Sequence, residues 1–380
     1  MNEKSIVSPE DQGATFVELF FDLVFVFAIT QVTYYSAHHL DVHGVLRSVL
    51  VFWLIWWGWT QFTWALNAAN TDHHHVRLGT LISTGVAFVM AVSVGKAFAP
   101  DPSDALWFVL SYIAVRTLGL GLYYKVASGN VDQRSAVVTF ALLSMGGLAA
   151  VFVGGLVDPL LRDWLWLVAI AMDLGAAWIA VKSGAWGLHA GHFAERHGLI
   201  VIIALGESLI VAGSGLTSDI TPGLMVTGSI AVLATCLLWW TYFGWIAEVM
   251  ETELTRQTGR ERARLARDAY TLWHFPLVSG IIALAVGFEA SFRPDDYALI
   301  QITVAVGVGL TLFLASTAGA LWRAKGCILW NRLIVLTITL GGLALGATSS
   351  INQILGTACV GLALIVGIEQ VTVRRRMGRA

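Results

Sequence analysis

Apolar runs of about 20 residues recur along the whole chain and constrain its fold more than any other feature. An α-helix rises about 1.5 Å per residue, so each run is long enough to cross roughly 30 Å of hydrocarbon. The chain is 57% hydrophobic and only 13% charged, whereas a soluble domain carries about 25% charged residues. No polar stretch is long enough to form a soluble domain, so the sequence predicts an all-α, polytopic helical membrane protein.

Twelve transmembrane helices are predicted, and the last two are the least clearly divided. Ser349, Ser350 and Asn352 form a weak separator that a re-entrant hairpin could also contain, so eleven crossings is the alternative. Glu18 and Asp22 interrupt the first apolar run, which argues against a cleavable signal peptide. The predicted spans are 15–38, 44–66, 77–98, 104–126, 134–157, 163–182, 198–216, 223–248, 269–290, 297–320, 329–347 and 350–371.

The distribution of positive charge predicts the orientation of the chain. With twelve spans, eighteen of the twenty-three Lys and Arg residues fall in segments on the side of the membrane that holds the N-terminus, among them Arg196 and Arg332. Positive charge favours the cytoplasm, so both termini are predicted to be cytoplasmic. A net charge of −2 predicts no nucleic-acid partner. We interpret the basic run 256–267 as an inner loop facing anionic membrane lipids.

Matching motifs in the two halves predict an internal duplication. Leu54-Ile55-Trp56-Trp57 aligns with Leu237-Leu238-Trp239-Trp240, and the order of further matches is kept while their offset drifts slowly. Asp22 aligns near Glu207, and Asp173 aligns with Glu369. The sequence therefore predicts two parallel six-helix repeats, residues 1–190 and 191–380, that together form one membrane domain.

Ionisable residues inside the spans are the candidates for function. Each costs at least about 2.5 kcal/mol at bilayer depth, so each needs a partner, an aqueous cavity or a functional role. Glu207, well inside its span, is the strongest single candidate. The predicted substrate-binding or proton-binding residues are Glu18, Asp22, Arg116, Asp173, Glu207 and His274.

Glu18 and Asp22 lie one helical turn apart near the cytoplasmic mouth of the first span. As a proton relay they would share one proton. As an anchor, both would be anions that the helix dipole and nearby donors stabilise. The sequence leaves both interpretations open.

Arg116 should remain charged and is predicted to pair with Asp22, Asp173 or Glu207. It would then either fix helix register or hold an anionic substrate. Glu369 lies near the inner interface, where Arg374 or Arg375 is its expected partner.

The histidines allow more than one interpretation. His274 shares a span with Pro276, whose missing N–H frees carbonyls that a cavity could use, although a neutral, hydrogen-bonded histidine is the commoner case. His73–His75 form a short loop tract, and His189, His192 and Glu195 have a spacing that could bind a metal. Both sets are interpreted as loop residues exposed to water, and no metal site is assigned. Any cofactor is unknown. Cys236, Cys327 and Cys359 are interpreted as small packing residues.

Three runs resemble the bacterial low-temperature-requirement A family, LtrA: Val17–Ala28, Gly198–Leu209 and Trp273–Leu277. The resemblance extends over nearly the whole chain. It implies a multi-pass protein of the bacterial plasma membrane, in a family named for a growth phenotype in the cold. It supplies no biochemical activity.

A secondary transporter or permease that uses intramembrane carboxylates is the leading functional hypothesis. The alternative is an intramembrane enzyme acting on lipid or polyprenyl carriers, although no known nucleophile or phosphate-binding motif is recognised and an enzyme is the less favoured class. A scaffold or sensor without flux is the third hypothesis. The expected partners are membrane lipids and a small molecule or ion of unknown identity, and a homo-oligomer stays open.

Overall fold

The protein is mainly helical over the residues that the computed structural model describes, which are 5–9, 12–183, 186–215, 221–293, 295–346 and 350–377. An isolated antiparallel bridge joins Val7 and Ala69. Short 3₁₀ turns follow three of the helices, η1 at Val94–Lys96, η2 at Ala127–Gly129 and η3 at Val181–Ser183, and the π-helical turn η4 at Ala266–Leu272 leads into α11. The α-helices are α1 (Phe16–His38), α2 (Val42–Asn67), α3 (His74–Val92), α4 (Pro102–Val126), α5 (Val131–Leu156), α6 (Pro159–Ala180), α7 (Ala190–Gly215), α8 (Pro222–Phe243), α9 (Ile246–Arg256), α10 (Gly259–Leu265), α11 (Trp273–Ser291), α12 (Leu299–Lys325), α13 (Trp330–Leu345) and α14 (Ile351–Met377).

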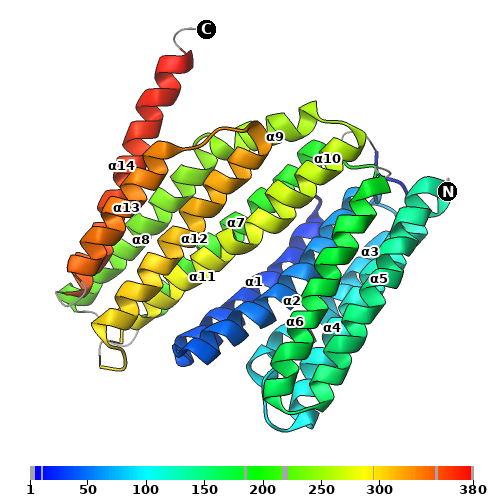
Figure 1. The fold of residues 1–380 in the computed structure, drawn as a ribbon, viewed down its shortest axis with the longest axis horizontal. Coiled ribbons are helices and arrows are strands. Elements are labelled where there is room, and N and C mark those ends of the chain that lie inside the picture. Colours follow the sequence, from blue (N-terminus) through cyan, green and yellow to red (C-terminus); the bar gives the residue numbers. More distant parts are fainter. Residues whose placement is uncertain are drawn as a thin grey trace. The chain divides into compact units, whose positions relative to one another are not determined.

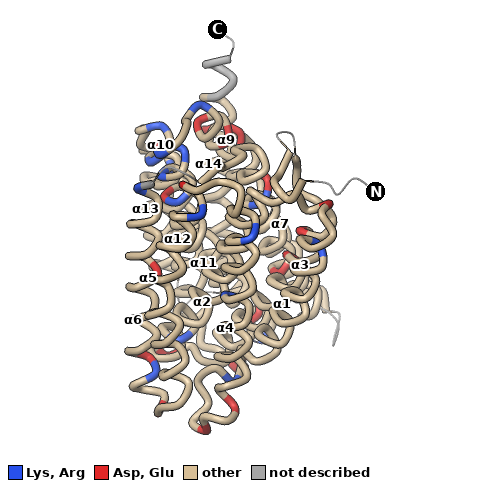
Figure 2. Tube along the Cα trace, turned by 90° about the vertical axis from the view of Figure 1, so that its right-hand side faces the viewer, with Lys and Arg blue, Asp and Glu red and all other residues tan. Residues whose placement is uncertain are grey.

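Eleven helical segments of the described chain are long and apolar enough to cross a membrane. A twelfth apolar helix, α13, has 16 residues, or about 24 Å of helix against roughly 30 Å of hydrocarbon. Figure 2 shows that most charged positions gather toward the helix ends. These findings confirm the predicted all-α, polytopic membrane fold.

The division between the last two apolar helices falls where the sequence is weakly polar. Ser349 lies outside the described residues, whereas Asn352 lies in the first turn of α14 and accepts a hydrogen bond from the Thr227 hydroxyl at 2.8 Å. The side chains of Arg374 and Arg375 also lie outside the described part of the chain.

Local sequence explains where several helices begin. Asp101-Pro102, Asp158-Pro159 and Thr221-Pro222 each place a side-chain acceptor at the N-cap and a proline in the first turn. Proline costs nothing there because its missing N–H would have no intrahelical partner. Asp41 caps α2 in the same way, and its bonds from the Gly44 and His43 amides hold the pKa of this exposed carboxyl below its ordinary value.

The chain forms two compact units. Unit 1 comprises residues up to Ile200 together with Leu254–Arg267, and unit 2 comprises Val201–Glu253 and the residues from Asp268 onward. In unit 1, α1 packs on α2 and α3, α4 packs on α2, α3 and α5, and α5 packs closely along α6 (Figure 1). The helix α2 is deeply enclosed, with Leu54 to Trp57 all buried.

In unit 2, α11 and α12 pack closely against each other, and α14 packs on α8, α12 and α13. Glycine makes the contact between α11 and α12 close: a Cβ atom on Gly280 would lie 2.8 Å from the Gly309 carbonyl oxygen. Two helix backbones can approach each other this closely only where both residues at the contact are glycine or another very small residue.

Arg162 joins three segments at the end of unit 1 where α6 begins. Its fully buried guanidinium donates to the carbonyls of Gly154 and Val157 at the end of α5, and to those of Ala97 and Ala99 after η1. The last carbonyls of a helix lack part of their intrahelical hydrogen bonding, and this one cation supplies donors to them.

Candidate functional site

Four ionisable side chains meet in unit 1, and none is exposed. Glu18 and Asp22 lie one turn apart on α1, and His192 and Arg196 lie one turn apart on α7. Residues four apart share a helix face, so the acidic pair and the basic pair can face each other across the contact. We call these four residues the buried cluster.

Arg196 binds both carboxylates of the buried cluster. Its Nη1 donates to Glu18 Oε1 at 2.8 Å, its Nε donates to Asp22 Oδ2 at 3.1 Å, and its Nη2 donates to Asp22 Oδ1. His192 Nε2 lies 3.0 Å from Glu18 Oε1 and 3.2 Å from Oε2. Trp59 Nε1 donates to Asp22 Oδ1 at 2.8 Å from α2.

The start of α1 supplies further donors. The Thr15 amide and hydroxyl donate to Glu18 Oε2 at 3.0 and 2.9 Å. Glu195, on α7, accepts from the Ala14 amide at 2.8 Å and so ties the two helix starts together. Every oxygen of Glu18 and Asp22 therefore accepts at least one hydrogen bond. Hydrogen-bond donors of this kind favour the ionised form of a carboxylate.

Charge is not balanced within the buried cluster. Two carboxylates face one guanidinium, so electroneutrality requires one more proton, on His192 or on a carboxylate. A buried net charge is costly. The contacts of the buried cluster anchor α1 against α7.

Asn67, at the end of α2, connects the buried cluster to the segment before α7. Its Nδ2 donates to the His189 carbonyl at 2.9 Å, its Oδ1 accepts from the His189 amide at 2.8 Å, and Nδ2 also lies 3.3 Å from His192 Nδ1.

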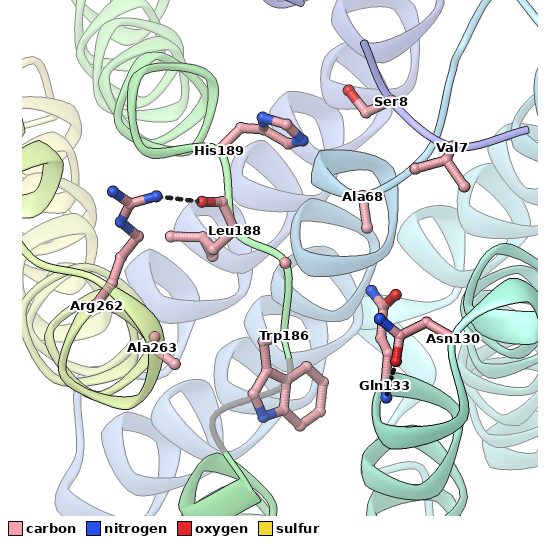
Figure 3. A pocket seen from close by; sticks show the side chains of 12 residues that line it. Val7, Ser8, Ala68, Asn130, Gln133, Trp186, Leu188, His189, Arg262 and Ala263 are labelled. Atoms are coloured by element: carbon pink, nitrogen blue, oxygen red, sulfur yellow. Dashed lines mark hydrogen bonds between the residues drawn. The ribbon is translucent and has the colours of Figure 1, made fainter. Parts of the chain in front are cut away.

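His189 lines a pocket of about 750 Å³ in unit 1. Polar walls come from Ser8, Asn130 and Gln133, and the indole of Trp186 forms part of the floor (Figure 3). Arg262 of α10 donates to the Leu188 carbonyl at 3.0 Å and to the carbonyls of Gln257 and Thr255. Its guanidinium is thus engaged in holding backbone.

Arg116 pairs with Asp173, one of the three carboxylates predicted for it. The pair is bidentate, with Nη1 donating to Oδ2 at 2.9 Å and Nη2 to Oδ1 at 3.0 Å. Gln61 accepts from Arg116 Nε and donates to its backbone carbonyl, and the Tyr112 hydroxyl accepts at 2.7 Å. Because its donors are occupied by α2, α4 and α6, the arginine joins three helices of unit 1.

Glu369 pairs with Arg332 of α13, whereas the sequence suggested Arg374 or Arg375. The bonds from Arg332 measure 2.6 Å to Oε1 and 2.8 Å to Oε2, and Trp245 Nε1 adds a third at 2.7 Å. Arg332 itself is 1% exposed in the first turn of α13.

Two candidates lie elsewhere in unit 2. His274 is fully buried, with Nδ1 3.0 Å from the Ala269 carbonyl and Nε2 2.7 Å from the Tyr242 hydroxyl. A carbonyl only accepts, so Nδ1 carries the proton and the ring is satisfied as a neutral histidine. Glu207 is 1% exposed on α7. The neighbouring Ser208 hydroxyl is buried and has no hydrogen-bond partner among the described residues.

The buried cluster contains two residues outside the predicted site residues, His192 and Arg196. The interpretation of His192 as a loop residue was wrong, because it lies on α7 and is 3% exposed. The apolar run begins at residue 198, whereas α7 begins at Ala190, because the polar first turns of this helix are buried against α1 and α2 and not against lipid. The matching four-residue spacing of an acidic pair and a basic pair at two span starts was the available signal. Among the described residues, no group of three or more His, Cys, Asp or Glu side chains is arranged to hold a metal.

Comparison with known proteins accounts for nearly the whole chain. Residues 13–367 match the family described as bacterial low temperature requirement A protein (LtrA). An uncharacterised protein of Rhizobium meliloti (strain 1021) is 30% identical over 327 residues, which cover 82% of this chain and 77% of that relative. No solved structure matches. The chain is thus a multi-pass membrane protein that belongs to the bacterial low temperature requirement A (LtrA) family.

Proposed function

We propose that this protein is a secondary transporter or permease in which intramembrane carboxylates bind the substrate or a coupling ion. One observation carries the proposal: Glu18 and Asp22 share a single guanidinium, that of Arg196, with no exposure of any of the three side chains. Burying an unbalanced set of charges opposes folding. Ionisable groups retained at such a position in membrane proteins commonly mark ion pathways and proton relays.

The two units resemble each other in how they bind a buried arginine, which supports the proposed duplication. Arg116 is contacted by Gln61, Tyr112 and Asp173, from the second, fourth and sixth spans. Arg332 is contacted by the Thr241 carbonyl, the Thr317 hydroxyl and Glu369, which the predicted repeat places in the corresponding three spans. The arginine itself comes from the fourth span in one unit and the fifth in the other. Duplicated folds of this kind are common among secondary transporters.

The proposed location is the bacterial plasma membrane with both termini in the cytoplasm. The excess of Lys and Arg in the segments on the same side of the membrane as the N-terminus supports this orientation. The buried cluster and the pocket lie where α1 and α7 begin and α2 ends, which this orientation assigns to the cytoplasmic side.

Transport is testable with purified protein in proteoliposomes. The probes are an entrapped pH-sensitive dye and a labelled panel of amino acids, sugars, organic acids and nucleosides. We expect Asp22→Asn and Glu207→Gln each to lower flux of the transported compound at least about tenfold, because each neutralises a buried carboxylate while preserving its shape. Asp72→Asn is the matched control, since Asp72 is more than half exposed and pairs with Arg77 at the surface. Unchanged flux in both variants at every pH would show that these carboxylates have no transport role.

A further inference from the structure

Asn67 fixes the protonation state of His192 by way of the His189 backbone. A backbone amide only donates and a carbonyl only accepts. The Asn67 atom that accepts from the His189 amide must therefore be the oxygen, and the atom that donates to the His189 carbonyl must be the nitrogen. The second hydrogen on this nitrogen points to His192 Nδ1, 3.3 Å away. Nδ1 must then be the acceptor, and the proton of the neutral ring lies on Nε2, between the two oxygens of Glu18.

With His192 neutral, the buried cluster holds two negative charges and one positive charge. The charged groups of the cluster are Glu18 and Asp22 from α1 and Arg196 from the same helix as His192. Glu195, also on α7, is exposed and binds the Ala14 amide, and α2 presents the uncharged amide of Asn67. A proton on His192 Nδ1 would balance these charges. The imidazole is the group of the buried cluster that becomes a cation when it takes up a proton, through the lone pair on Nδ1.

Protonation of His192 is incompatible with the present position of Asn67. A proton on Nδ1 would face the Asn67 amide hydrogens, donor against donor. Turning the amide would present its oxygen to His192, but it would also put a donor against the His189 amide and an acceptor against the His189 carbonyl. Both bonds between Asn67 and His189 would be lost together, because each has a fixed direction.

The segment that would be released lines the pocket. Trp186, Gly187, Leu188 and His189 form one side of it. Figure 3 shows Arg262 bound to the Leu188 carbonyl, and this attachment would remain when the bonds from Asn67 break. The Phe193 amide also donates to the His189 carbonyl at 3.0 Å, and Trp186 Nε1 donates to the Ala180 carbonyl at 3.0 Å, so the segment would shift between fixed ends. Gly187, with φ at +54°, provides a backbone position at which the segment can pivot.

We propose that His192 is the proton-binding residue of this protein and that Asn67 couples its protonation to the position of the 186–189 segment in the pocket wall. This inference rests on the proposed transport function and names the proton as its coupling ion. A proton entering from water binds Nδ1 of the imidazole, no covalent bond to carbon changes, and the positive charge is held by Glu18 and Asp22.

Hydrogen–deuterium exchange of the full-length protein in lipid nanodiscs tests the coupling. The His189 amide is a direct reporter because it donates to Asn67. After correction for the intrinsic pH dependence of exchange, we expect its protection to fall at least about tenfold between pH 8 and pH 5. In His192→Gln, which cannot titrate, this fall should disappear. His38→Gln is the matched control, because His38 is an exposed histidine of the same unit and should leave the fall intact.

The wild-type protein also provides a readout that does not depend on the folding of a variant. Nitrogen NMR of protein labelled at histidine should show, at pH 8, a buried ring protonated on Nε2 that gains a second proton as the pH falls. The inference would be overturned if the exchange protection of the His189 amide did not change across this pH range. It would also be overturned if the folded His192→Gln variant showed the same fall in protection as the wild type. Neither measurement requires a transported compound. If the exchange and NMR results contradict the inference while the proteoliposomes show transport, only the role of His192 is removed. If the exchange and NMR results agree with the inference while the proteoliposomes show no transport, only the transport proposal is removed.

Discussion

Replacing Arg196 with methionine is expected to lower the free energy of unfolding by about 3 to 5 kcal/mol, the usual cost of removing one partner from a buried ion pair. Methionine keeps an unbranched stem but provides no donor. Glu18 loses its 2.8 Å bond and Asp22 loses two bonds, so two carboxylates remain buried without a cation. Denaturant unfolding in mild detergent, followed by tryptophan fluorescence, measures the difference.

Two further variants distinguish charge burial from simple loss of a contact. Arg77→Met removes a cation whose pair with Asp72 is about half exposed, and should change the free energy of unfolding by no more than about 1 kcal/mol. Combining Arg196→Met with Glu18→Gln and Asp22→Asn should recover much of the lost stability, because no unpaired charge is then buried. An Arg196→Met protein as stable as the wild type would mean that water reaches the buried cluster.

Replacing Gly280 with valine is expected to cost about 3 kcal/mol or more, at the upper end of the range for overpacked cores. A Cβ atom at this position would lie 2.7 Å from the Phe313 backbone nitrogen and 2.8 Å from the Gly309 carbonyl oxygen. Both atoms belong to the α12 backbone, so they cannot turn aside as a side chain could. The helices α11 and α12 would have to separate, with loss of packing along their contact. The same unfolding measurement applies.

Gly341→Val provides the matched control for Gly280→Val. Gly341 lies within α13 of the same unit, and a Cβ atom there would meet nothing within 4 Å. We expect the free energy of unfolding of this variant to lie within about 0.5 kcal/mol of the wild-type value, as it does for most surface substitutions. Equal stability of the two variants would contradict the close backbone contact between α11 and α12.

The sequence identified some of the candidate residues and missed others. The burial of Asp22, Asp173 and Glu207 followed from their positions inside apolar runs, and the pairing of Arg116 with Asp173 was one of three options. His192 and Arg196 were assigned to an inner segment because the residues before 198 are too polar for a lipid-facing span. In the structure these polar residues lie in the first turns of α7, where the side chains of His192 and Arg196 are buried by protein.

By itself the sequence determined that the chain is a set of membrane-crossing helices, because the length of an apolar run and the cost of charge in lipid depend only on local composition. Only the tertiary structure decided which charges meet. Glu18 and His192 are separated by 174 positions along the chain, and their contact depends on how α1, α2 and α7 pack. Local patterns set which residues must leave water, whereas packing sets which partner each of them finds there.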